Sequence, residues 1–305
     1  MNSMRESCNA CGGTLTSRFS RVRDPITKES FGILACTKCG LGHTHPHPPD
    51  LSPYYGRYYY GGRHGITAKF CIRHRLRLLE NAIENATQKR LLDIGCGDGS
   101  FLLAAKEAGW NVTGTEINPH PARAFNLDIR HTLDEIEDPE QFECVTMWHS
   151  LEHMKDIKSI LHLIAKRLTP RGRLIIAVPN NDSLQAKLFG PGWLPLDVPR
   201  HLYHFNPGSL RFSLENAGFH VYRSGQHEIE YDLLGWSQSA LNYLNRTPNI
   251  FFDILSGKGK HHSVWARTSN FILGPILTLA STVALPVEAL MGRSGTFVMT
   301  ACRKV

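Results

Sequence analysis

Short apolar runs alternate with amphipathic stretches through the middle of the chain. The segments at 91–94, 111–116, 142–149 and 173–178 have the apolar character of buried strands. One stretch between them repeats apolar residues at helical spacing: Ile157, Ile160, Leu161, Ile164 and Leu168. Strands that alternate with helices predict an α/β fold with a doubly wound, mostly parallel sheet.

Two further strands are predicted near the end of the chain, at 219–225 and 296–302. The apolar segment between them is then an insertion. The predicted organisation is a cysteine-rich head at 1–50, a tyrosine-rich linker and leading helix at 51–87, a core at 88–225, a helical insertion at 226–294 and a final strand at 295–305.

A glycine-rich turn stands where the first core strand should meet its helix. Its pattern is Asp93-x-Gly95-x-Gly97-x-Gly99. Glycines let the backbone turn sharply and approach a ligand, and the amides that open a helix favour negative charge. The Gly-x-Gly-x-x-Gly spacing that seats a pyrophosphate is absent, and Asp93 would repel a pyrophosphate but could hold an ammonium.

This turn resembles the first motif of the class I, seven-stranded S-adenosylmethionine-dependent methyltransferases, and residues 88–225 follow that family's order of elements. The resemblance implies a Rossmann-like sheet with an antiparallel last strand. It also implies that the turn wraps the methionine part of the cofactor and that Glu116 accepts its ribose hydroxyls. The residues expected to bind the cofactor are Asp93, Gly95, Cys96, Gly97, Gly99, Glu116, Ile117, Trp148 and His149.

Two Cys-x-x-Cys pairs near the start predict a zinc site. Cys8, Cys11, Cys36 and Cys39 offer four thiolates, which form a closed tetrahedral site of the zinc-ribbon type. We interpret the metal as a structural staple, because a catalytic zinc normally keeps an open position; a recognition module is the alternative. The histidines that follow could be extra metal ligands, but because four cysteines are already available they are interpreted as solvated loop side chains: His43, His45 and His47.

Aromatic and basic residues connect this head to the core. A tyrosine-rich loop at 53–60 is predicted to pack the head on the core, or else to act as a lid. The helix that follows carries Arg73, Arg75 and Arg77, which we interpret as a solvated face. A cysteine head with such a linker resembles a bacterial branch of the family, the methyltransferases of type 11 and 23.

Composition narrows the partners and the compartment. The net charge of +7 and the pI near 9.0 favour an anionic partner: a nucleotide-linked substrate, a nucleic acid or an acidic membrane surface. Paired cysteines next to scattered ones favour a reducing compartment over a disulfide framework. The polar N-terminus lacks the apolar core of a signal peptide, so a cytoplasmic location is expected.

Three histidines are candidates for the catalytic base, and His201 is the one expected to act as the base. The segment at 179–182 lacks the paired prolines and aromatic ring with which nucleic-acid amino methyltransferases grip an amine, which favours an oxygen or, second, a carbon acceptor. Oxygen methylation needs a proton acceptor, for which histidine is well tuned. His201 and His204 lie in a Pro-x-His-x-x-x-Phe segment that resembles one branch of these enzymes, and His153 follows the fourth strand. All three could instead hold their loops through hydrogen bonds.

The insertion contains an apolar run at 271–291, interrupted by Pro275, Pro286 and Glu288. Its length approaches that of a membrane span, but a single crossing would leave the last strand on the wrong side of the membrane. A re-entrant or surface-lying hairpin with basic flanks is therefore one interpretation, which makes the protein peripheral at the inner face of the membrane. A cap on the sheet or a dimer contact is the other.

Three functions are compatible with these patterns. The first is methyl transfer from S-adenosylmethionine to an oxygen, or less readily a carbon, of a small-molecule, glycan or lipid-linked acceptor. The second is an RNA methyltransferase, which the basic charge and zinc head support but the dispersed positive residues do not. The third is a non-catalytic zinc-ribbon adaptor on a methyltransferase scaffold. The oligomeric state is not encoded in any of these patterns.

Overall fold

The computed structural model describes residues 7–55, 67–83, 88–118, 122, 125–137, 140–245 and 247–304. The chain forms two compact units, each assembled from separate stretches. The sheet unit comprises Thr67–Val178, Arg211–Gln226 and Val298–Val305. The head unit comprises Met1–Ile66, Pro179–Leu210 and His227–Phe297. These units cut across the predicted boundaries, because residues 179–210 and 227–297 belong to the same unit as the cysteine-rich head.

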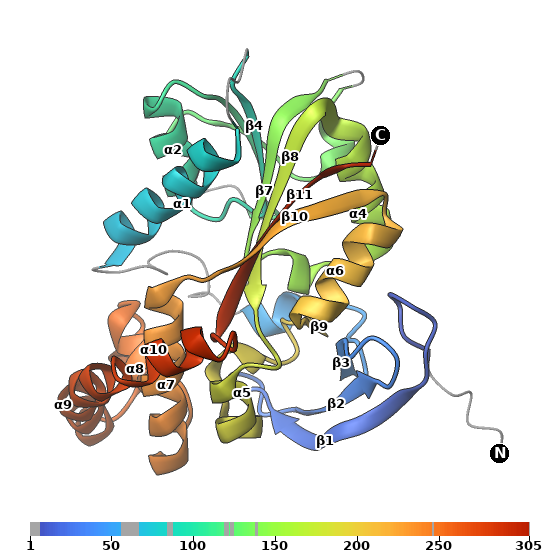
Figure 1. Cartoon of the computed structure of the whole chain (residues 1–305). Coiled ribbons are helices and arrows are strands. Elements are labelled where there is room, and N and C mark those ends of the chain that lie inside the picture. Colours follow the sequence, from blue (N-terminus) through green and yellow to red (C-terminus); the bar gives the residue numbers. More distant parts are fainter. Residues whose placement is uncertain are drawn as a thin grey trace. The chain divides into compact units, whose positions relative to one another are not determined.

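The sheet unit is built on seven strands (Figure 1). They are β4 (Arg90–Ile94), β5 (Asn111–Thr115), β6 (Asp128–Arg130), β7 (Phe142–Trp148), β8 (Leu168–Pro179), β10 (Phe219–Gln226) and β11 (Thr296–Arg303). Their order is β10-β11-β8-β7-β4-β5-β6. The central strand β4 is parallel to both β5 and β7, whereas β11 runs antiparallel to β10. The predicted fold class is confirmed.

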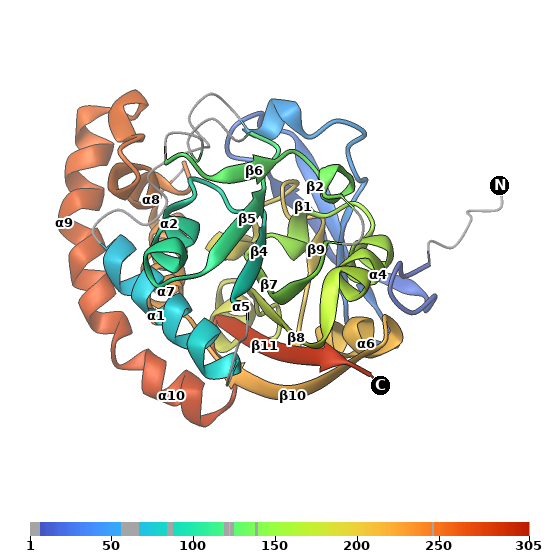
Figure 2. The ribbon, with the colours of Figure 1, turned by 90° about the horizontal axis from the view of Figure 1, so that it is seen from above.

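Helices cover both faces of this sheet. The helices α1 (Ala68–Ala82) and α2 (Ser100–Glu107) lie on one face and α4 (Ile157–Arg167) lies on the other (Figure 2). Short 3-10 turns, η3 (Leu133–Glu135) and η4 (Leu151–His153), and the helix α6 (Pro207–Asn216) complete the connections. The side chains that α1, α2 and the strands turn inward form one apolar core, which includes Leu79, Leu91, Leu102 and Ile175.

The head unit contains a second, antiparallel sheet. Its first three strands are β1 (Leu15–Arg23), β2 (Ser30–Cys36) and β3 (Gly42–His45), followed by the turn η1 (Ser52–Tyr55). The fourth strand, β9 (Tyr203–His204), comes from far along the chain and pairs with β3, so that His204 lies opposite Gly42. The predicted head at 1–50 therefore acquires its last strand from the Pro-x-His-x-x-x-Phe segment. Tyr58, Tyr59 and Tyr60 of the linker lie outside the described residues.

Helices from two later stretches complete the head unit. The first stretch supplies α5 (Leu184–Phe189), η5 (Gly190–Gly192) and η6 (Leu194–Leu196). Phe189 of α5, together with Trp193 between η5 and η6, packs with Phe31 and Ile33 of β2. The second lies between β10 and β11, as the predicted insertion does. It comprises α7 (Ile229–Leu244), α8 (Ile250–Leu255), η7 (Gly259–His261), α9 (Val264–Ser281) and α10 (Ala284–Leu290).

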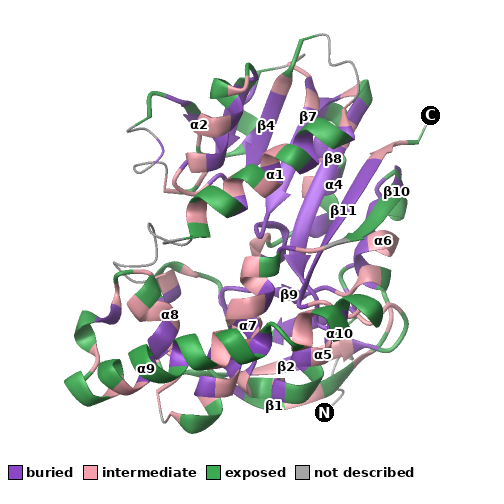
Figure 3. Cartoon of the chain, turned by 60° about the vertical axis from the view of Figure 1, so that its left-hand side comes forward, coloured by how far each residue is buried: buried purple, intermediate pink, exposed green. Residues whose placement is uncertain are grey.

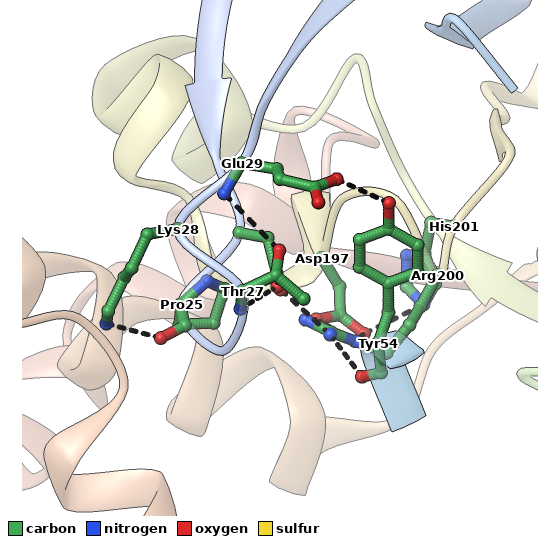
Figure 4. A network of polar contacts seen from close by, with 9 residues as sticks. Pro25, Thr27, Lys28, Glu29, Tyr54, Asp197, Arg200 and His201 are labelled. Atoms are coloured by element: carbon green, nitrogen blue, oxygen red, sulfur yellow. Dashed lines mark hydrogen bonds and ion pairs between the residues drawn. The ribbon is translucent and has the colours of Figure 1, made fainter. Parts of the chain in front are cut away.

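A buried arginine joins three segments of the head unit (Figure 4). The guanidinium of Arg200 donates to Asp24 in the β1–β2 turn at 2.9 Å and to Asp197 at 2.6 Å. It also donates to the carbonyl oxygen of Tyr54 at 2.8 Å. The Tyr54 hydroxyl donates in turn to Glu29 at 2.5 Å. Asp24 is wholly buried, and Arg200 is its cationic partner at 2.9 Å.

We expect Arg200→Ala to lower the free energy of unfolding by about 3 kcal/mol, because it leaves the Asp24 carboxylate buried without its cation. Arg21→Ala is the matched control: Arg21 lies on the same hairpin but is exposed. It should change the free energy by no more than about 0.5 kcal/mol. Urea unfolding followed by tryptophan fluorescence measures both. Equal losses in the two variants would show that the cluster is not a structural anchor.

Candidate functional site

The glycine turn follows β4 in the sheet unit. The amides of Gly95 and Cys96 donate to the carbonyl oxygen of Thr115 at 2.8 and 3.0 Å, which fixes the turn to the end of β5. Gly95, Gly97 and Gly99 all have positive φ, a conformation that side chains rarely tolerate. A Cβ on Gly95 would lie 2.6 Å from the Cβ of Ser150, whereas one on Gly97 would meet nothing within 4 Å. The turn is therefore packed against Ser150 at Gly95 and open at Gly97.

A buried carboxylate lies beside this turn. Asp93 is the residue before Ile94 at the end of β4, and its Oδ1 accepts a hydrogen bond of 2.6 Å from the hydroxyl of Thr146 on β7. Burial raises the pKa of Asp93 to about 7, an effect that the Thr146 bond and the charge of Arg75 oppose and that Glu116 reinforces. Near neutral pH, Asp93 is therefore poised between its charged and neutral forms.

The interpretation of Arg75 as part of a solvated face is wrong. Its side chain is buried, and its guanidinium carbon lies 4.9 Å from the ring centroid of Trp148 at the end of β7. The ring of Phe101 in α2 meets the same indole edge to face at 5.5 Å. The indole Nε1 is buried and has no hydrogen-bond partner among the described residues. Arg73 and Arg77 are exposed, as predicted.

Glu116 lies across the turn from Gly97. Its Oε2 accepts the Gly97 amide at 2.9 Å, and its Oε1 accepts the Asn118 amide at 3.2 Å. The adjacent Ile117 is largely exposed. Cys96, by contrast, turns its side chain into the apolar core, and burial raises the pKa of its thiol. Only the backbone of Cys96 is therefore available to a ligand on the turn.

His149 carries backbone strain at the carboxyl end of β7. Its φ is +52°, in the left-handed region that a histidine rarely adopts. The amide of His149 donates to Ala177 of β8 at 2.9 Å, and its Nδ1 lies 3.7 Å from Oε1 of the buried Glu152. Such strain persists where the surrounding structure enforces it, and it is concentrated at functional sites.

The three predicted base candidates fall in different environments. His153 ends the turn η4 in the sheet unit and is half-buried. His201 is in the head unit, where its Nδ1 lies 2.8 Å from the carbonyl oxygen of Pro195. His204 is buried in β9, with its Nε2 3.0 Å from the Thr44 hydroxyl, and burial lowers its pKa well below the usual value. The same hydroxyl donates to the carbonyl oxygen of His201 at 2.6 Å, so Thr44 links the two head-unit histidines.

The four predicted zinc ligands meet in the head unit. Their sulfur atoms all lie within 4.8 Å of one another, with 3.6 Å between Cys8 and Cys39 and 3.3 Å between Cys11 and Cys36. Tetrahedral zinc with bonds of about 2.3 Å requires a separation of roughly 3.8 Å between sulfur atoms. A Cβ on Gly13 would lie 2.9 Å from the sulfur of Cys36, so glycine leaves room for the cluster. The arrangement fits a closed four-thiolate site.

The interpretation of His43 as a solvated side chain is wrong. It is buried on β3, and its Nε2 lies 3.4 Å from the sulfur of Cys8. Burial lowers the pKa of His43 to about 4, so the ring is neutral at physiological pH. His43 is thus a neighbour of the cysteine cluster. His45 and His47 are exposed, as predicted.

Sequence reasoning missed the residues that support the turn from β7 and α1, namely Thr146, Ser150 and Arg75. Thr146 pairs in register with Asp93, and the Ser150 hydroxyl donates to the carbonyl oxygen of Ile94 at 2.6 Å. Both contacts depend on β4 and β7 being neighbours, which the order of strands in the sequence does not specify. A prediction of the sheet order would have identified Thr146.

Comparisons with known proteins agree with this geometry. Residues 63–224 match a family described as a methyltransferase domain. The chain is 28% identical over 155 residues to a ubiquinone biosynthesis O-methyltransferase of Idiomarina loihiensis, a match that covers 45% of this chain and 63% of that protein. An Erwinia tasmaniensis protein of the same name is 31% identical over 140 residues, which cover 40% of this chain and 58% of that protein. The chain therefore spans about six-tenths of the length of these relatives.

The fold has a counterpart among solved structures. A proposed sarcosine dimethylglycine methyltransferase from Galdieria sulphuraria superposes with a TM-score of 0.50 and 14% sequence identity, covering 78% of this chain and 85% of that one. The family match includes the glycine turn, Glu116 and the strands on either side of them. The chain therefore belongs to the class I S-adenosylmethionine-dependent methyltransferases.

Proposed function

We propose that this protein transfers the methyl group of S-adenosylmethionine to a hydroxyl oxygen of a small-molecule acceptor. The observation that carries the proposal is the similarity to O-methyltransferases of ubiquinone biosynthesis. The absence of an amine-gripping motif at 179–182 supports the same choice of atom. The comparisons give no support to a glycan or lipid-linked acceptor, so the proposal extends only to a small molecule with a hydroxyl group.

The turn fits a cofactor that carries an ammonium and two ribose hydroxyls. The space beside Gly97 is open, since a Cβ at this position would meet nothing within 4 Å. The buried Trp148 Nε1 is a hydrogen-bond donor that has no partner among the described residues. We assign the ammonium to Asp93 and the ribose hydroxyls to Glu116, whose two oxygens are already oriented by backbone amides. Ile117 and His149 complete the lining. When bound, the cofactor supplies a methyl group activated on a sulfonium.

We assign the role of proton acceptor to His153. It follows the carboxyl end of β7, the edge at which open α/β sheets bind ligands. His201, the base expected from the sequence, and His204 instead contact Pro195 and Thr44 in the head unit, and the His204 contact joins β9 to β3. In this mechanism Nδ1 or Nε2 of His153 would take the hydroxyl proton as the acceptor oxygen bonds to the methyl carbon, whose bond to the sulfonium sulfur would break to leave a neutral thioether.

The affinity for S-adenosylmethionine should fall as the pH falls below about 7. The ammonium pairs with ionised Asp93, so protons compete with the cofactor for this carboxylate. With a pKa of about 7 in the free protein, the affinity at pH 5.5 should be about 25-fold weaker than at pH 7.5. Isothermal titration calorimetry measures both values.

Asp93→Asn removes the titrating group, so this variant should bind more weakly and with little dependence on pH. Asp128→Asn makes the same change at an exposed carboxylate of the sheet unit and should retain the full pH dependence. If Asp93→Asn kept the pH profile of the unmodified protein, the ammonium assignment would be wrong.

Methyl transfer to oxygen can be tested without knowledge of the acceptor. The protein is incubated with tritium-labelled S-adenosylmethionine and an extract of the source cells, separated into small-molecule and RNA fractions. We expect label in the small-molecule fraction that hydriodic acid releases as methyl iodide, because this reagent cleaves O-methyl ethers. His153→Ala should lower the rate at least about 100-fold with little change in cofactor affinity, as loss of a general base does.

His162→Ala is the matched control, since His162 is exposed on α4 and should leave the rate unchanged. Label that resists hydriodic acid would contradict oxygen methylation. Label in RNA alone would favour the RNA methyltransferase. Cofactor binding without any transfer would favour the adaptor.

We also propose that Cys8, Cys11, Cys36 and Cys39 hold one structural zinc ion. The spacing of the sulfur atoms and the room left by Gly13 support this assignment. Four thiolates complete a tetrahedral shell, so no position remains for a substrate or an activated water. The metal would then stabilise the β1–β3 hairpins and take no part in methyl transfer.

Purified protein should contain about one zinc ion per chain, because a four-thiolate site binds a single ion. Cys36→Ser should abolish this zinc content and lower the melting temperature. Cys302→Ser, a partly buried thiol of β11, should alter neither quantity. Mass spectrometry of the metal and calorimetry of unfolding provide the measurements. Full zinc occupancy in Cys36→Ser would refute the ligand set.

A further inference from the structure

The longest helix of the insertion is polar on its buried side and apolar on its exposed side. In α9 the buried residues are Asn270, Gly274 and Ser281. Much of α9 is exposed (Figure 3). Its exposed large apolar side chains include Val264, Trp265, Phe271, Ile272, Ile276 and Leu279. The apolar surface continues through Val283 and the 90% exposed Leu290 around α10. A surface helix of a protein in water has the opposite arrangement.

The interior against which α9 packs contains polar contacts beside the buried ring of Phe251 in α8, which Gly274 approaches closely. The amides of Asn245 at the end of α7 and Asn270 of α9 exchange hydrogen bonds of 3.0 and 3.3 Å. Glu288 of α10 is wholly buried and accepts the Gln185 amide at 3.2 Å. Helices that pack in lipid associate in this way, through small residues and polar contacts between helices.

Several polar side chains of α9 donate hydrogen bonds to carbonyl oxygens of the same helix. Asn270 donates to the carbonyl oxygen of Ala266 at 2.9 Å, Thr278 to that of Gly274 at 2.8 Å and Ser281 to that of Leu277 at 2.6 Å. Because these bonds need no water, the helix tolerates an apolar environment. Pro275 lies within α9 directly after Gly274, whose carbonyl oxygen accepts the hydrogen bond from Thr278.

From residue 254 onward, the charged side chains of the sequence are almost all positive. Lys258, Lys260 and Arg267 precede or open α9, and Arg293 follows α10. Glu288 is the sole acidic residue of the sequence after Asp253, and it is buried. Basic residues beside an apolar helix face complement anionic lipid headgroups. Trp265, near the start of α9, is a residue type that prefers the membrane interface.

We propose that α9 and α10 bind the surface of an anionic lipid bilayer, with their exposed apolar side chains in the acyl region. In the described part of the chain, a bilayer-spanning length of apolar helix is reached only by α9 and α10 together, with a 40° bend between them. A bent pair with basic ends suits a hairpin that lies in the interface. A second copy of the chain would present the same positive charges to this surface, which disfavours self-association. The inference is independent of the methyl acceptor.

Co-sedimentation of the full chain with vesicles tests the proposal. We expect binding to vesicles of 70% phosphatidylcholine and 30% phosphatidylglycerol, and weaker binding to phosphatidylcholine alone or at high salt. The triple variant Phe271→Gln, Ile276→Gln, Leu279→Gln should lose more than about a hundredfold in affinity for these vesicles, because it replaces three apolar side chains that the bilayer would bury. All three are exposed in the protein, so the fold should survive, as circular dichroism can verify.

The control variant carries the same number of changes at exposed apolar positions elsewhere: Ile26→Gln, Phe70→Gln and Leu188→Gln. It should bind vesicles like the unmodified protein. A second measurement uses Trp265, whose fluorescence should be quenched by brominated lipid and whose quenching should disappear in Trp265→Phe.

Two results would overturn the proposal. One is vesicle binding that the triple variant retains in full. The other is a protein that leaves vesicles unbound but forms a dimer in analytical ultracentrifugation, with the triple variant monomeric; this result would assign the surface to a second copy of the chain.

Discussion

The hydrogen bond between Asp93 and Thr146 links the two strands on which the site depends. It joins β4 to β7 inside the sheet at 2.6 Å, in the same register that makes these residues backbone neighbours. Because β4 is parallel to β5 and β7, Glu116 and His149 emerge at the same edge as the glycine turn. A carboxylate buried at this position destabilises its own charged form, as the raised pKa of Asp93 records. A cost of this kind is typical of a residue kept for its chemistry.

The path of the chain explains why the two units are interleaved. After β8 the chain leaves the sheet unit to build α5 and β9, returns for β10, leaves again for α7 to α10, and returns as β11. The antiparallel pairing of β10 with β11 thus anchors both ends of the helical insertion in one sheet. Because β10 and β11 are neighbours in one sheet, the insertion must begin and end on the same side of any membrane that it contacts. A hairpin meets this requirement, whereas a single membrane crossing does not.

Sequence patterns predicted the strands and the glycine turn, which depend on residues close together in the chain. Apolar runs located the strands, and Asp93 with its glycines located the turn, because positive φ selects glycine wherever the chain turns so sharply. The errors fall where a distant partner decides burial. Arg75 is buried by Trp148 and His43 by the cysteine cluster, and neither partner is adjacent in sequence. The boundary at residue 50 missed β9 for the same reason, since strand pairing across such a separation leaves no periodic signal.

The insertion shows a further limit of pattern reading. A helical period identifies two faces of α9 but not which of them is turned inward, so an apolar stripe is equally compatible with a cap on a core and with a lipid-facing surface. The hydrogen bonds show which residues are turned inward. Asn270 reaches Asn245 after α7, and Gln185 reaches Glu288 of α10, so these polar side chains meet inside the head unit. A cap would bury the apolar stripe to gain free energy from its removal from water. In the described part of the chain, that stripe remains exposed.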